Sequence, residues 1–154
     1  MLVPLLLGWL AVIISMVIQV TALVVMLRYL IRILSDPSNA NAGILFDCYI
    51  ISIVLLVLFT GHLVQVGAWA TLFQSLGEFG DFQTAFYHSM VNFTSLGYGD
   101  IVMSEQWRLL GALEASVGIL MFGLSAGILV AVMNPLFARH IPTKEQGAKL
   151  HQKK

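Results

Sequence analysis

Charged residues are scarce in this sequence. Charged residues make up 10% of the 154-residue chain, hydrophobic residues make up 58%, and no charged residue precedes Arg28. Soluble globular proteins carry about 25% charged residues, so this composition excludes an ordinary soluble domain and indicates a membrane protein. The formal net charge is zero, which gives no reason to expect nucleic acid as a partner.

Cysteine is scarcer still. Cys48 is the single cysteine, which excludes an internal disulfide and a multi-cysteine metal site. The sequence also shows no pairing of a nucleophile with a base and no metal-ligand cluster, so we expect the protein not to be an enzyme.

Long apolar stretches are abundant. A membrane-spanning helix needs about 20 apolar residues, and the stretches 3–34, 43–76 and 105–133 each exceed that length. The first stretch has no positive charge before it and is too long for a signal peptide, so it predicts a retained helix. The turn-rich segment 35–41 separates it from the second stretch.

A fourth apolar stretch, 82–94, is too short to span. It follows Asp81, a good N-cap residue, and leads into Gly97-Tyr98-Gly99. A half-length helix followed by a glycine-rich segment predicts a re-entrant loop, which is tolerated at membrane depth only where protein buries it or where it lines a watery path.

The expected fold is therefore an all-α membrane protein with three transmembrane helices, a re-entrant pore helix and an extended filter segment. We expect an additional N-terminal helix in 1–34, a pore domain in 43–137 and a basic cytoplasmic tail in 138–154. Cytoplasmic segments carry an excess of Lys and Arg, so Arg28, Arg32 and the tail predict an outside N-terminus and a cytoplasmic C-terminus. The expected location is a plasma membrane of the bacterial type, and the tail suits contact with anionic lipid.

The segment 94–100, Thr-Ser-Leu-Gly-Tyr-Gly-Asp, resembles the selectivity filter of potassium channels, whose pattern is Thr-Val-Gly-Tyr-Gly-Asp. Ser95 stands in place of the family's threonine and Leu96 in place of its valine; the following four residues match. The resemblance extends over about 81–132. The second helix fits the outer helix of two-span channels by position only, and the first helix lies outside that pattern.

The resemblance implies a homotetramer that conducts K⁺ as its permeant ion. A ring of backbone carbonyls can replace the water around a dehydrated K⁺, and glycine reaches the left-handed conformations that such a filter needs. The residues expected to coordinate K⁺ are Ser95, Leu96, Gly97 and Tyr98, with Gly99 and Asp100 at the filter exit.

Three residues are expected to support the filter: Thr94, His88 and Glu114. His88 should lie beside the filter near Tyr98. Glu114 is the only acidic residue well inside a predicted span, which makes it a functional candidate. Helical geometry turns it toward the pore helix, where donors are available on His88, Ser89, Asn92 and Thr94; the alternative is that it reaches the outer headgroups.

The last helix is expected to line the cavity below the filter. Periodicity places Ile119, Phe122 and Ala126 on one face. Gly118 is either a gating hinge, as in the resembling family, or a small residue that permits close helix packing.

Three other functions remain open at this point. Ser95 is compatible with a nonselective monovalent cation channel. His62 and His88 are compatible with a haem-binding redox subunit. The chain as a whole is compatible with a noncatalytic membrane assembly factor. The first helix lacks the arginine series of a voltage sensor, so the gating stimulus and any gating partner stay undetermined.

Overall fold

Three long helices and one short helix make up the computed structural model, which describes residues 2–39 and 43–138. The long helices are α1 (Leu2–Leu34), α2 (Ile44–Ser75) and α4 (Arg108–Ala138), and the short one is α3 (Phe82–Phe93). A 3-10 turn, η1 (Pro37–Asn39), follows α1. No strand occurs in these two ranges, so the expected all-α membrane fold is confirmed.

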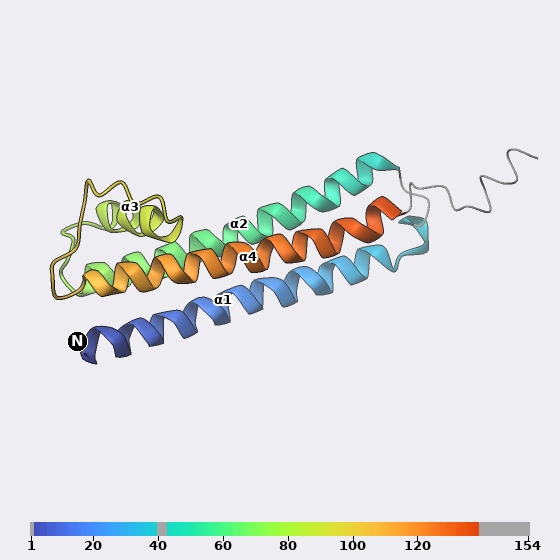
Figure 1. Ribbon diagram of the computed structural model, residues 1–154. Helices are drawn as coiled ribbons and strands as arrows, with labels where there is room; N and C mark the ends of the chain where they lie inside the picture. Colours follow the sequence, from blue (N-terminus) through green and yellow to red (C-terminus); the bar gives the residue numbers. More distant parts are fainter. Residues whose placement is uncertain (1, 40–42, 139–154) are drawn as a thin grey trace, which may run out of the picture.

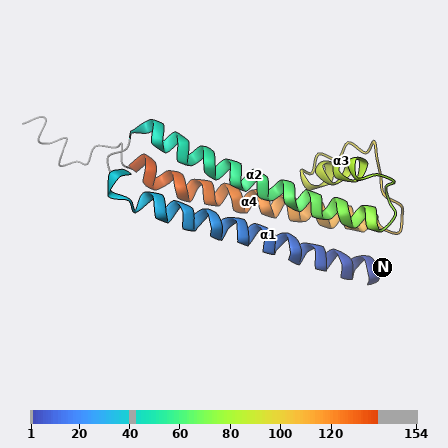
Figure 2. The same cartoon turned by 180° about the vertical axis from the view of Figure 1, so that it is seen from behind.

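The long helices lie side by side, and α3 packs at one end of this bundle, the end where α1 begins (Figures 1 and 2). All three are apolar enough to cross a membrane. Within the chain only 22% of the most apolar window of α1 and 28% of that of α2 is buried. The remaining apolar surface therefore has to be covered by lipid or by other protein.

The helix boundaries follow local chemistry. Asp81 caps α3 by accepting a hydrogen bond from Thr84 N at 2.8 Å, and this N–H holds the pKa of the Asp81 carboxyl below its usual range. At the other end of the bundle, Asp36 accepts from Ser38 Oγ at 2.6 Å and from Ser38 N at 2.9 Å, which lowers the pKa of Asp36 in the same way. Both residues act where a helix or turn has unpaired N–H groups.

The last helix differs from its predicted span of 105–133. It begins at Arg108, because the preceding residues form a turn in which Trp107 N donates to Ser104 O at 3.0 Å. It also continues through Pro135 to Ala138. Proline removes one helical hydrogen bond, but Leu136 is fully buried against α1 and α2, and this packing outweighs the missing bond.

Two apolar cores hold the bundle together. The core near α3 includes Trp69, Phe73 and Phe93. The core at the opposite end includes Met26, Leu58 and Leu136, contributed by α1, α2 and α4. Of the predicted tail 138–154, only Ala138 falls within the described residues.

Candidate functional site

The segment that follows α3 turns back toward the end of the bundle from which α3 starts (Figure 1). Its beginning is held by the last turn of α3: Ser95 N donates to Asn92 O at 2.8 Å, and Leu96 N donates to Val91 O at 3.0 Å. The helix and its return segment thus form a re-entrant unit between α2 and α4.

The backbone of the return segment alternates in hand. The φ angle is +56° at Ser95, +62° at Gly97 and +71° at Gly99, and it is not positive at the residues between them. Nothing lies within 4 Å of a Cβ added at either glycine, so the conformation and not crowding calls for glycine there. Ser95 is the only non-glycine residue with positive φ in the described chain.

The carbonyl oxygens of residues 95–98 accept no hydrogen bond from the described parts of the chain. Residues 94–100 are also exposed in the single chain, with Tyr98 66% exposed. Backbone groups at membrane depth need a partner, because no bulk water is available there. This row of unpaired carbonyls is therefore free to coordinate a cation.

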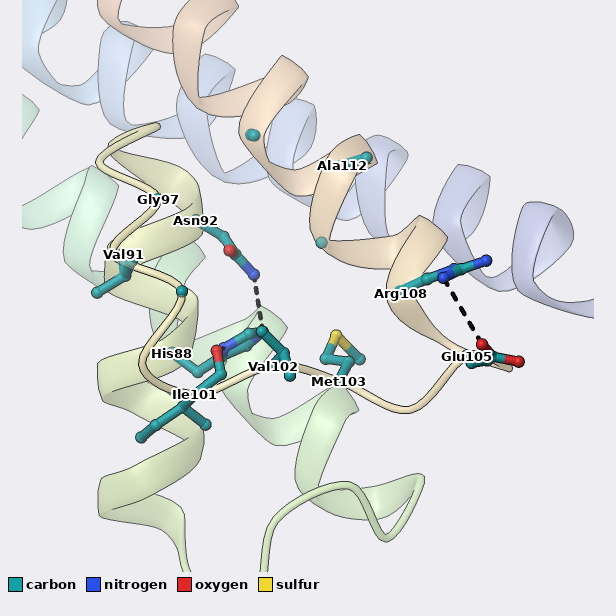
Figure 3. A pocket seen from close by; sticks show the side chains of 13 residues that line it. His88, Val91, Asn92, Gly97, Ile101, Val102, Met103, Glu105, Arg108 and Ala112 are labelled. Carbon is teal, nitrogen blue, oxygen red and sulfur yellow. Dashed lines mark hydrogen bonds and ion pairs between the residues drawn. The ribbon is translucent and has the colours of Figure 1, made fainter.

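Side chains of α3 fix the end of the return segment that is farther along the chain from α3. Tyr87 Oη donates to Asp100 Oδ2 at 2.8 Å. His88 Nδ1 lies 3.1 Å from Ile101 O, and Asn92 Nδ2 lies 2.9 Å from His88 Nε2 (Figure 3). Because the carbonyl can only accept, Nδ1 carries the hydrogen and Nε2 accepts from the amide. His88 thus contacts the backbone of the return segment one residue beyond Asp100.

Glu114 lies where three helices meet. It is fully buried and hydrogen-bonded to Ser89 on α3, whose Oγ is also 2.9 Å from Val66 O on α2. Ser89 is one of the four expected donors. Full burial places the carboxyl inside the protein at the contact of α4 with α3, and not among headgroups.

Gly118 on α4 touches the end of α3. A Cβ added there would stand 1.8 Å from Phe93 O, far inside contact distance, so this glycine is needed for close packing. Ile119, Phe122 and Ala126 are exposed in the single chain, and Ile119 is 62% exposed. They follow Gly118 along α4 and so lie beyond its contact with the end of α3. Thr94, the last filter-support candidate, bonds its hydroxyl to Met90 O of α3 at 2.8 Å.

A clamp between the loop before α3 and the loop before α4 has no counterpart in the sequence analysis. Glu78 accepts from Ser104 N and from Ser104 Oγ, both at 2.7 Å, and so joins the loop before α3 to the loop before α4. These residues are 26 positions apart, and nothing in the local sequence signals that they meet. A cavity of about 620 Å³ adjoins this region, lined by α3, the return segment and the first two turns of α4 (Figure 3).

The two histidines considered for haem lie on different helices and have protein partners. His62 Nε2 on α2 is 3.1 Å from Ser125 Oγ, whereas His88 on α3 bonds to Ile101 and Asn92. Within residues 2–39 and 43–138, no group of three or more His, Cys, Asp or Glu side chains is arranged to hold a metal ion.

Three spans with a re-entrant helix and return segment between the last two define an integral membrane protein built around a re-entrant loop. Residues 53–134, just over half of the chain, match the model of a family described as ion channel. The chain therefore belongs to this ion channel family. The match covers α3 and most of α2 and α4 but leaves out α1. No curated protein and no solved structure matches the chain.

Proposed function

We propose that the chain is one subunit of a homotetrameric potassium-selective channel, with the carbonyls of Ser95, Leu96, Gly97 and Tyr98 as the K⁺ ligands. The observation that carries this proposal is the alternation of positive φ at Ser95, Gly97 and Gly99, together with the unpaired carbonyls of residues 95–98. Carbonyl rings of this kind replace the hydration shell of K⁺.

Assembly follows from the same segment. One chain supplies one return segment, and a carbonyl ring around an ion needs several. The exposure of residues 94–100 in the single chain supports the view that other copies surround them. A closed ring of identical subunits is the usual solution for soluble homo-oligomers and applies equally to a pore with a central axis.

The distribution of charge supports the permeation of a cation and the proposed orientation in the membrane. The C-terminal end of α3 carries partial negative charge and is followed by the filter, so it favours a cation in the cavity beneath. The clamp residue Glu78, together with Asp100 and Glu105, makes the outer mouth acidic. Arg28 and Arg32 lie at the opposite end of α1, and an excess of Lys and Arg on the cytoplasmic side supports a cytoplasmic position for that end and an outside N-terminus.

The second candidate is a nonselective monovalent cation channel, favoured by Ser95 in place of the family's threonine. Reversal potentials of the purified protein in planar bilayers, with K⁺ on one side and Na⁺ on the other, decide between the two. A potassium-selective pore reverses near the K⁺ equilibrium potential. Reversal near zero in the K⁺/Na⁺ gradient contradicts the proposal and supports the nonselective pore.

A further inference from the structure

The centre of α1 carries two polar side chains that are buried against the other spans. Ser15 is fully buried and Gln19 is 1% exposed, although most of α1 is exposed. Trp69 Nε1 on α2 donates to Ser15 Oγ at 3.0 Å, and Gln65 Nε2 on α2 donates to Gln19 Oε1 at 2.8 Å. Polar groups inside an apolar span are costly unless they are bonded. These contacts therefore fix which face of α1 meets the bundle.

Gln19 also bonds to the last span. Its Nε2 donates to Ser125 Oγ on α4 at 3.1 Å, and Ser125 Oγ lies 3.1 Å from His62 Nε2 on α2. Since Ser125 accepts from Gln19, its own hydrogen is free to bond to His62. The residues Gln65, Gln19, Ser125 and His62 thus form a chain of hydrogen bonds from α2 through α1 and α4 back to α2, here called the Gln19 network.

The Gln19 network contacts α4 at Ser125, next to the proposed cavity face. Ser125 lies between Gly123 and Gly127, where an added Cβ would find nothing within 4 Å, and it adjoins Ala126 of the proposed cavity face. Beyond Glu114, Ser125 is the only residue in the described part of α4 whose side chain hydrogen-bonds to another helix. One polar side chain therefore anchors a helix segment that has open space around both neighbouring glycines.

Close approach of the backbones strengthens the attachment of α1. A Cβ added at Gly61 of α2 would lie 3.5 Å from Ala22 Cβ of α1, so small residues bring these two helices together. Near its start, α1 also approaches α4, because a Cβ at Gly8 would lie 2.4 Å from Leu113 Cδ1. Although the family match leaves α1 out, α1 is packed along the pore helices over most of its length.

We propose that α1 is a resident control helix of the pore, in which Gln19, through its bond to Ser125, sets the position of the lower half of α4 and thereby the balance between open and closed channels. Gln19 and Ser125 are positioning residues, because neither is placed on the ion path. This inference rests on the proposed role of α4 as the pore-lining helix, and it does not depend on which ion the pore selects.

Single-channel recordings in planar bilayers test it with wild type, Q19L, S125A and the double variant. Each single substitution should change the open-to-closed ratio by about threefold or more, in the same direction, since this is the scale of one hydrogen bond between membrane helices. Unitary conductance and reversal potential should stay unchanged, because the filter is intact. The effect of the double variant should be smaller than the sum of the two single effects, because both substitutions remove the same Gln19–Ser125 bond.

Thr21→Val is the matched control. Thr21 also lies on α1, but it is exposed and its hydroxyl bonds only to Val17 O of its own helix, at 2.7 Å. If Q19L fails to assemble, S125A alone carries the test, since it removes one oxygen and leaves Gln19 its bond to Gln65. An unchanged open-to-closed ratio in S125A, or effects of the two substitutions that simply add, overturns the inference. A wild-type reversal potential near zero would instead contradict only the proposed potassium selectivity.

Discussion

Gly97 and Gly99 adopt positive φ in open surroundings, so they separate backbone conformation from side-chain crowding. Replacing either with alanine adds a methyl group that meets nothing within 4 Å, but the left-handed conformation then costs about 1–2 kcal/mol per subunit. We expect G97A and G99A to abolish K⁺ flux from proteoliposomes while the protein stays folded and assembled.

Gly80 provides the control for this pair. It also has open space around it, lies in the loop before α3, and has no positive φ. G80A should therefore conduct like wild type. Normal potassium flux in G97A or G99A would show that the alternating backbone is not the filter.

Variants at Glu114 test whether its contact with Ser89 on α3 stabilises the return segment. Glu114→Ala removes one of the two partners of Ser89, which keeps its bond to Val66 O, and loss of one buried hydrogen bond costs about 0.5–1.5 kcal/mol in each subunit. We expect E114A to lose current rapidly during prolonged recording. Glu114→Gln should be milder, because its amide can donate to Ser89 Oγ while Ser89 donates to Val66 O.

The comparison variant for Glu114 is S116A, on the same helix. Ser116 is exposed, and its hydroxyl bonds only to Ala112 O of α4 itself, at 3.0 Å. The side chain of Glu114 is buried off the proposed ion path, so the effect of E114A should vary little with membrane voltage. Stable wild-type currents from E114A over the tested pH range would rule out its supporting role.

At the scale of elements, α3 and α4 depend on a single close contact. Gly118→Ala would place a methyl group 1.8 Å from Phe93 O, so either α4 or the end of α3 has to move. Overpacking of this kind costs about 1–3 kcal/mol or more. We expect G118A to lower the thermal unfolding temperature in detergent and to reduce current.

Gly123 is the matched position for this experiment, since it lies on the same helix and an added Cβ meets nothing within 4 Å. G123A should stay near wild type in unfolding temperature, because alanine is also the better helix former. Equal unfolding temperatures for G118A and G123A would contradict the packing role of Gly118.

The elements themselves were predictable, because length and hydropathy specify a membrane helix almost alone. The bounds expected for α2 and α3, and Asp81 as the N-cap, agree with the structure to within about one residue. The continuation of α4 past Pro135 could not be predicted, because it depends on the packing of Leu136 against other helices. The rule that proline ends a helix takes only the neighbouring residues of the chain into account.

Contacts between elements were the part that the sequence could not supply. Glu114 stood out as a lone carboxylate in a span, and its partner Ser89 was among the candidates. Gln19 stands out in the same way near the middle of α1, but its bonds to Gln65 and Ser125 depend on how α1 packs. The choice between hinge and packing at Gly118 likewise needed the position of Phe93 O.

At the scale of the whole molecule, the decisive question is how many copies share one filter. If four return segments form each carbonyl ring, one strained segment should disable the entire pore. Mixing wild-type and G99A subunits in equal amounts then leaves a fully wild-type ring in only about one sixteenth of the tetramers, by random assembly of four subunits. We expect the K⁺ current per protein to fall to about that fraction.

A matched mixture with G80A subunits should keep the full current, which separates filter damage from simple dilution. A dimeric pore would instead retain about one quarter of the current, and independent single-chain pores about one half. The native mass in detergent, corrected for bound lipid, should equal four chains of 16.9 kDa in both mixtures. A residual current near one half would contradict a shared filter even if the mass were tetrameric, because each subunit would then conduct by itself.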